Sequence, residues 1–243
     1  MNFLVIFTIG GNAMLVLLLS CLFSMEVEER ATKLSIENRG LPSCNQKIDI
    51  GLKSSVRIGF SLGDGLGGWG SGNYVKLGKY KFVITAAHVI QEGNIFVVDG
   101  SEDVPARVLY NNPYRDIAII EPLGSLSIEP VNLKINSEAD VIGSLVNYTG
   151  FPSDLGQTTY TGFISKSSEQ AVIIQSFALP GSSGSVVFDK KGRAIGVVSA
   201  VKVQDSPLSP FPELVETLVY VERFSFITKK FLKEVYMGAN GRK

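Results

Sequence analysis

A serine can attack an amide only when a neighbouring base removes its hydroxyl proton and a carboxylate holds that base in one tautomer. Backbone N–H groups must also face the oxyanion that develops on the attacked carbonyl. The sequence offers one base of the histidine type, because His88 is the only histidine among the 243 residues. It comes soon after the strand-like residues 81–85, and the intervening Ala86 and Ala87 allow close packing at a strand end. Judged alone, a lone histidine is also compatible with a structural or surface role.

The carboxylate and the hydroxyl have candidates further along the chain. Asp116 opens the apolar run of residues 117–120, an odd place for an acid in a core strand. It is either a solvated turn residue or a partly buried carboxylate that takes the imidazole N–H. Ser183 lies in the glycine-containing residues 180–185, where successive N–H groups can point into one concavity. An ordinary hairpin turn is the alternative there, and the neighbouring Ser182 competes for the role.

The elements that must position these residues read as short strands separated by Gly, Asn, Asp and Pro. Two series of about six strands are expected, on either side of residues 123–132. The predicted fold class is therefore all-β, with two six-stranded antiparallel β-barrels, a C-terminal α-helix and an N-terminal apolar helix. His88 and Asp116 fall in the first series and Ser183 in the second, so the three would meet across a cleft between barrels.

The same pattern predicts the domain boundaries. We expect an apolar segment (1–24), a linker (25–50), an N-terminal barrel (51–125), a C-terminal barrel (126–222) and a C-terminal helix and tail (223–243). In the last part Phe224, Ile227, Phe231 and Val235 recur at helical spacing, which indicates an amphipathic helix docked on the second barrel or, alternatively, lying on a membrane surface.

The apolar segment bears on localisation. Residues 2–24 contain no charged side chain. A helix of this length can cross a hydrocarbon core of about 30 Å. No basic residue precedes it and no clear small-x-small cleavage site follows, which favours an uncleaved anchor over a signal peptide or a buried element. We therefore expect a membrane-associated or exported protein, on a side of the membrane that the flanking charges do not fix.

Composition excludes several other classes. Lys plus Arg equals Asp plus Glu at 23 each, so nucleic acid is not an expected partner. Cys21 lies inside the apolar segment and Cys44 lies outside it. Two separated cysteines and one histidine cannot build a zinc cluster of the usual Cys/His type. Residues 63–68 match G-x-G-x-x-G, but no helix pattern follows them, so no nucleotide or other cofactor is expected.

Several motifs together resemble the trypsin-like (chymotrypsin-fold) serine peptidases, closer to disulfide-free bacterial or viral members. The order His, Asp, Ser is that family's order and differs from those of subtilisin and the α/β-hydrolases. The resemblance spans about residues 56–235 and rests on these pieces: WGSG (69–72), ITAAHV (84–89), RDIAII (115–120), PGSSGSVVF (180–188), GRAIGVVSAVK (192–202) and LVYVERFSFITKKFLKE (218–234).

The resemblance implies a serine endopeptidase with no cofactor and no metal, acting on protein or peptide. It implies Ser183 as nucleophile, His88 as base and then acid, and Asp116 as its orienter. The family's oxyanion hole would consist of the N–H groups of Gly181 and Ser183. Substrate-binding residues, by the same resemblance, are these: Phe177, Ser199, Ala200 and Val201.

Two features depart from parts of the family. Ser182 stands where trypsin-type zymogens have an aspartate, so activation through that ion pair is not expected. The sole histidine is already assigned, so a histidine in the S1 pocket is also not expected. Phe177 instead suggests an apolar P1 preference.

Other functions remain open on the sequence. A catalytically silent chymotrypsin-fold module could bind peptides, and a membrane-anchored scaffold could hold peptide ends without cutting them. The enzyme could be a membrane-tethered processing protease of the polyprotein or housekeeping kind. A separate possibility is that it cuts only itself or its own precursor.

Overall fold

The computed structural model describes residues 49–63, 66–90, 93–100, 102–136, 142–204 and 213–240. All of them belong to the unit of residues 45–243, which is distinct from residues 1–44. The predicted apolar helix of residues 1–24, most of the linker and both cysteines lie outside the described residues. Within the described residues, no helix has the length and apolar character needed to cross a membrane.

The first half of this unit is a closed barrel. Six strands follow one another in the order β1-β4-β5-β6-β3-β2, and pairing of β1 with β2 closes the ring. A short strand, β7, adds to β2 in parallel. The bounds are these: β1 Ser55–Gly63, β2 Leu66–Leu77, β3 Tyr80–Thr85, β4 Asn94–Asp99, β5 Glu102–Asn112, β6 Ile117–Pro122 and β7 Val131–Asn132. A helix, α2 (Asp49–Ser54), precedes β1.

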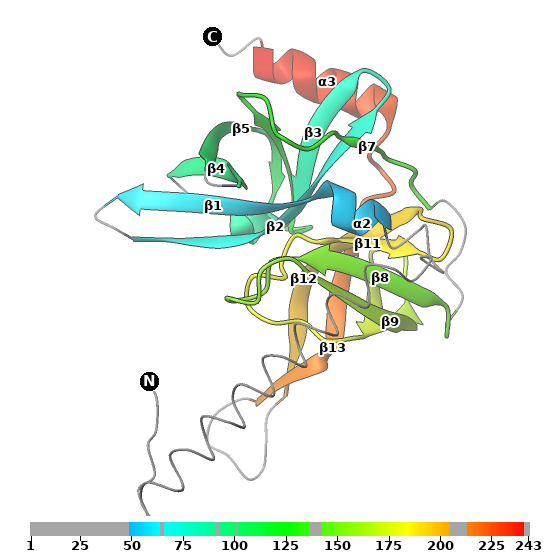
Figure 1. Cartoon of the computed structure of the whole chain (residues 1–243). Helices are drawn as coiled ribbons and strands as arrows, with labels where there is room; N and C mark the ends of the chain where they lie inside the picture. Colours follow the sequence, from blue (N-terminus) through cyan, green and yellow to red (C-terminus); the bar gives the residue numbers. More distant parts are fainter. Residues whose placement is uncertain are drawn as a thin grey trace, which may run out of the picture. The chain divides into compact units, whose positions relative to one another are not determined.

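The second half is also a closed barrel, with strand order β10-β13-β12-β11-β8-β9. Its bounds are these: β8 Leu145–Gly150, β9 Thr158–Ser167, β10 Ala171–Gln175, β11 Val186–Asp189, β12 Ala194–Gln204 and β13 Glu213–Arg223. The two barrels lie one above the other in Figure 1. The prediction of two six-stranded antiparallel barrels is confirmed, because alternating short apolar runs bury one face of each strand and closure leaves no unpaired edge.

The chain ends in helix α3 (Lys229–Asn240), which confirms the expected C-terminal helix. The expected start was wrong, since apolar spacing indicated a helix from Phe224. Phe224 and Ile227 are buried, but they belong to a turn in which the N–H of Ile227 donates to the carbonyl of Phe224. Thr228 then caps the helix, because its hydroxyl accepts a hydrogen bond of 3.1 Å from the N–H of Phe231.

The docking partner of α3 also differs from the expectation. The helix lies over the first barrel in Figure 1, and the hydroxyl of Tyr236 donates a 2.7 Å hydrogen bond to the carbonyl of Lys81 in β3. One buried apolar cluster joins residues of both barrels with the C-terminal segment, Phe82, Phe188 and Phe224 among them. The C-terminal segment therefore fastens the two barrels to each other.

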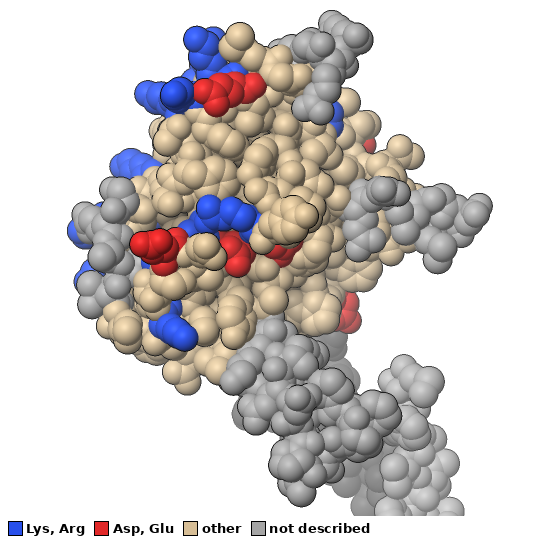
Figure 2. Space-filling view, turned by 180° about the vertical axis from the view of Figure 1, so that it is seen from behind, with Lys and Arg blue, Asp and Glu red and all other residues tan. Residues whose placement is uncertain are grey.

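On the face seen in Figure 2, most charged side chains lie on the left half, where groups of Lys and Arg stand beside fewer Asp and Glu. Uncharged residues cover most of that face.

Candidate active site

His88 and Asp116 form the first part of the site. His88 lies in the short 3-10 helix η1 (Ala87–Val89), which follows β3, and Ala86 and Ala87 are buried as a tight strand end requires. Its Nδ1 lies 2.8 Å from Oδ2 of Asp116. Its backbone N–H donates to Oδ1 of the same carboxylate at 2.9 Å. The carboxylate therefore fixes both the position of the segment and the tautomer with a proton on Nδ1.

Asp116 is held in an uncommon backbone conformation. Its φ is +44°, in the left-handed region that residues other than glycine rarely adopt. The N–H of Asp116 donates to the carbonyl of Pro113, which closes the turn between β5 and β6. Strain of this kind persists where surrounding contacts hold it and is commonest at functional sites.

The charge state of Asp116 follows from its partners. Burial alone would raise the pKa of this carboxyl, but hydrogen bonds from His88 and Ser199 outweigh burial and hold the pKa below its ordinary value. Asp116 is therefore an anion at neutral pH. An anion at this place can orient an imidazole and stabilise the imidazolium formed when the imidazole accepts a proton.

Ser199 has a role that the sequence analysis missed. It was predicted only as part of the substrate-binding strand, yet its hydroxyl donates a hydrogen bond of 2.5 Å to Oδ2 of Asp116. A register shift between Val198 and Ala200 leaves Ser199 unpaired with β13. Such a bulge re-aims a side chain, and here the hydroxyl reaches the first barrel. The sequence does not mark the bulge, because no Gly or Pro stands at residues 198–200 of β12.

Ser183 lies on the second barrel, in the loop before β11, and this loop is packed against the middle of β2 and the end of β3. Its carbonyl accepts a 2.8 Å hydrogen bond from the N–H of Ser71 in β2. The next residue, Gly184, has φ +89°, and a Cβ there would lie 2.3 Å from Oγ1 of Thr85 and 3.0 Å from the N of Ala86. The loop thus carries Ser183 to the strand end that bears His88. In the described part of the chain, no hydrogen bond joins the Ser183 hydroxyl to His88.

Gly181 precedes Ser183 with a backbone that only glycine adopts readily, at φ +94°. Its carbonyl accepts a 2.7 Å hydrogen bond from the Ser71 hydroxyl, which fixes the direction of that oxygen. Among the described residues, no acceptor pairs with the N–H of Gly181 or that of Ser183. Both donors are therefore free to meet a developing negative charge.

A hollow of about 540 Å³ lies beside Gly181 and is lined by residues of both barrels. Trp69, with 47 % of its side chain exposed, forms one wall, and Ser153 and Asp154 form another. The Arg57 guanidinium lies 4.7 Å from the Trp69 ring and holds it in place. A chain that binds across Gly181 would enter this hollow.

The remaining predicted substrate-binding residues lie on the second barrel. Phe177 follows β10 and is 57 % exposed, and Ala200 is also exposed. The backbone of Ala200 and Val201 pairs with β13 on one side. Beyond Val198, β12 pairs with no described strand on its other side. That edge is available to an extended peptide.

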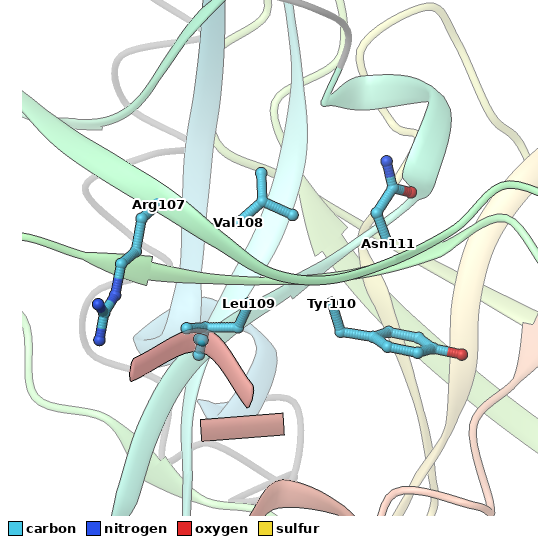
Figure 3. A pocket seen from close by; sticks show the side chains of 6 residues that line it. Arg107, Val108, Leu109, Tyr110 and Asn111 are labelled. Carbon is cyan, nitrogen blue, oxygen red and sulfur yellow. The ribbon is translucent and has the colours of Figure 1, made fainter. Parts of the chain in front are cut away.

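A second hollow, of about 500 Å³, lies between β5 and the end of α3 (Figure 3). None of the predicted site residues lines it. Across the described ranges, no group of three or more His, Cys, Asp or Glu side chains is placed to hold a metal ion.

Comparison with known proteins gives the family context. A family model described as "Trypsin-like peptidase domain" matches residues 70–197. The chain is 28 % identical over 147 residues to the "Serine protease HtrA-like" of Staphylococcus epidermidis, a match that covers 52 % of this chain and 25 % of that protein. It is 26 % identical over 143 residues to the "Probable periplasmic serine endoprotease DegP-like" of Bartonella henselae, covering 55 % and 28 % respectively. The chain thus spans about a quarter of the length of these relatives.

Solved structures share the fold. The serine endoprotease from Yersinia pestis superposes with a TM-score of 0.64 at 21 % identity, over 82 % of this chain and 69 % of that one. The active form of the Rv3671c protease from M. tuberculosis gives a TM-score of 0.60 at 20 % identity, over 74 % and 79 %. At such identities the likeness concerns the arrangement of the barrels.

Proposed function

The chain belongs to the trypsin-like peptidase family, and from this premise we propose that it is a serine endopeptidase whose triad is His88, Asp116 and Ser183. The observation that carries the proposal is the double grip of the Asp116 carboxylate on His88, through Nδ1 at 2.8 Å and the backbone N–H at 2.9 Å. This grip leaves Nε2 of the imidazole as the free, proton-accepting nitrogen. The loop that carries Ser183 is packed against the strand end of His88, which supports the third member.

The chemistry then follows in two steps. Nε2 of His88 takes the proton of the Ser183 hydroxyl as Oγ attacks the peptide carbonyl carbon, and the carbonyl oxygen becomes an oxyanion facing the N–H groups of Gly181 and Ser183. When the C–N bond breaks, the imidazolium returns its proton to the leaving amine. Water then attacks the acyl-enzyme by the same route and releases Ser183.

Hydrolysis of a denatured protein by purified protein tests the proposal. Fragments formed by the wild type and lost in Ser183→Ala and in His88→Ala are expected, with rate losses of about 10⁴-fold or more. A fluorophosphonate probe should label Ser183 in the folded wild type. Folded protein that neither cleaves nor is labelled would be the peptide-binding module of the same fold. Processing of a precursor in cis without cleavage of foreign substrates would confine the activity to self-cleavage.

The same proposal includes an apolar P1 preference. Phe177 is exposed, and the family resemblance places it near the base of the pocket for the substrate's P1 side chain. Peptides with Leu, Phe, Lys or Glu at P1 should be cleaved with kcat/KM highest for the apolar residues. Phe177→Ala should reduce that preference, whereas a basic or acidic optimum in the wild type would contradict it.

We also propose that residues 1–24 tether the protease to a membrane. The support is the absence of charged residues from 2 to 24. Full-length protein should sediment with membranes and resist carbonate extraction, and a protein lacking residues 1–24 should not. Recovery of both forms in the soluble fraction would exclude an anchor.

A further inference from the structure

Arg115 immediately precedes Asp116 in the chain, but its side chain reaches the second barrel. Its Nη2 donates a hydrogen bond of 3.1 Å to the carbonyl of Arg223, at the end of β13. Its guanidinium carbon lies 5.1 Å from the centre of the Phe226 ring. Arginine combines a fixed fork of donors with a flat face that stacks on rings, so both contacts are made by one side chain. The residue therefore ties the Asp116 turn to the second barrel.

The turn that carries Asp116 has one tie to the second barrel through the Ser199 hydroxyl, and Arg115 adds a second. It runs from Asn112 to Asp116, and besides the Asp116 N–H bond it is closed by the N–H of Arg115, which donates to both the carbonyl and Oδ1 of Asn112. These bonds are local and fix the shape of the turn, not its position relative to Ser199 and the second barrel. A positive φ at Asp116 costs free energy that contacts outside the turn must offset.

A bulge in β5 supports the same arrangement from the other end of the turn. The register with β6 shifts between Val108 and Tyr110, so Leu109 and Tyr110 point to the same side of the strand (Figure 3). The ring of Tyr110 thereby lies 6.1 Å from that of Phe226 and 5.1 Å from that of Phe231. Its hydroxyl accepts a 3.0 Å hydrogen bond from the side chain of Asn112, where the turn begins.

Charge gives Arg115 a second effect. Glu222, the residue before Arg223, lies close enough to act on Asp116. Burial raises the pKa of the Glu222 carboxyl, the positive charge of Arg115 opposes that rise, and the negative charge of Asp116 adds to it. The charge of Arg115 therefore lowers the pKa of the Glu222 carboxyl against the combined effect of burial and of Asp116.

We propose that Arg115 is a positioning residue for the Asp116–His88 pair, acting through its contacts with Arg223 and Phe226. The inference rests on the proposed function, since it assigns Arg115 to the same triad. Asp116 can hold His88 in register with Ser183, on the other barrel, only if the turn is fixed to that barrel. A displacement of about 1 Å at a site of this kind costs up to about 100-fold in rate.

The experiment compares Arg115→Met and Arg115→Lys with the wild type. Met keeps the apolar stem but removes the charge and the donor, whereas Lys keeps the charge and a donor without the planar fork. We expect kcat to fall about tenfold in Arg115→Met, with KM changed less than about twofold, and an intermediate loss in Arg115→Lys. Arg107→Met is the matched control, because Arg107 lies in β5, the strand before the turn, pairs with Glu121 of the same barrel and should leave kcat unchanged.

A spectroscopic readout separates positioning from a general loss of stability. Because the chain has one histidine, labelled histidine gives one set of imidazole NMR signals, all from His88. The downfield signal of the Nδ1 proton reports its hydrogen bond to Asp116. We expect this signal to move upfield or broaden in Arg115→Met and to stay in place in Arg107→Met.

Three outcomes would overturn the inference. The first is an unchanged Nδ1 proton signal together with wild-type kcat in Arg115→Met. The second is an equal loss of kcat in Arg115→Met and Arg107→Met. The third is a change of KM in Arg115→Met with no change of kcat. If Arg115→Met does not fold, the same criteria apply to Arg115→Lys. The NMR signal requires no turnover, so an inactive wild type would defeat the proposed function and leave the role of Arg115 to be decided by the spectrum.

Discussion

The hydroxyl of Ser71 donates a 2.7 Å hydrogen bond to the carbonyl of Gly181, a residue 110 positions later on the other barrel. The same hydroxyl accepts a 2.8 Å hydrogen bond from the N–H of Phe151. Ser71 is fully buried, so neither partner has water as a substitute. The carbonyl of Gly181 shares its peptide plane with the N–H of Ser182, which donates to the carbonyl of Leu179, so Ser71 anchors the loop at the peptide that lies between the two candidate oxyanion donors.

Ser71→Ala should therefore lower kcat by about tenfold with little change in KM, since the loop that carries both candidate donors loses a contact that fixes it to the first barrel. Two buried backbone groups are also left unpaired, which should lower the free energy of unfolding by about 1–3 kcal/mol. Steady-state kinetics and urea unfolding measure the two effects. Ser168→Ala is the control, because the Ser168 hydroxyl bonds only within its own exposed turn. Loss of stability without loss of kcat would argue against the positioning of Gly181 by Ser71.

Ser199→Ala should weaken the Asp116–His88 pair. Removing a hydrogen bond to a charged group costs about 1.5 kcal/mol, which corresponds to about tenfold in kcat if the bond persists in the transition state. The pKa of Asp116 should rise towards its ordinary value, because Ser199 is one of the donors that lower it. Carbon NMR of the Asp116 carboxyl during an acid titration checks the shift. Ser225→Ala, at an exposed serine just beyond β13, should change neither quantity.

Acid should destabilise the fold in part through Asp116. A carboxyl whose pKa is lowered on folding adds stability at pH values above its unfolded pKa, and this stability is lost as pH falls through the folded value. The difference in unfolding free energy between wild type and Asp116→Asn should thus be largest near about pH 7 and shrink below about pH 4. Denaturant unfolding across this range measures it. Asp103→Asn changes an exposed position of β5, so its free energy of unfolding should vary with pH in the same way as that of the wild type. A difference in unfolding free energy between wild type and Asp116→Asn that stays constant with pH would count against the linkage.

Gly184 offers a test of how the loop of Ser183 is packed. An alanine Cβ there would lie 2.1 Å from the carbonyl oxygen of Ser71, on top of the strain of φ +89°. Gly184→Ala should abolish activity and lower stability by more than about 3 kcal/mol. Gly143 has a similar φ of +84° with nothing within 4 Å of a Cβ, so Gly143→Ala should cost only about 1–2 kcal/mol and keep activity. Similar thermal stability of the two variants would contradict the packing argument.

The barrels were predictable because each strand carries its own signal. Short runs such as residues 81–85 and 117–120 alternate with turn residues, and closure follows from burying one face of each. The pairing of His88 with Asp116 was also predicted, from residue type and chain order. Whether these two and Ser183 act together stays a prediction until the variants are measured.

The rest depended on relationships that sequence patterns do not encode. The Ser199 hydroxyl reaches Asp116 because of a register shift, and Tyr110 meets Phe226 because of another. Both shifts occur within uninterrupted strands. The late start of α3 has a similar origin, since the helical spacing of Phe224 and Ile227 equally suits a tight turn that fills the space between the barrels.

The contact between Arg115 and Arg223 spans 108 residues, and that separation affects the order in which the site can form. During synthesis the first barrel emerges with His88 and Asp116 but without Ser183, Ser199 or the carbonyl that holds Arg115. Contacts of such long range form slowly and late in folding. A growing chain therefore passes through a stage that holds the imidazole and the carboxylate without Ser183, and the proposed triad is complete only after the second barrel has folded.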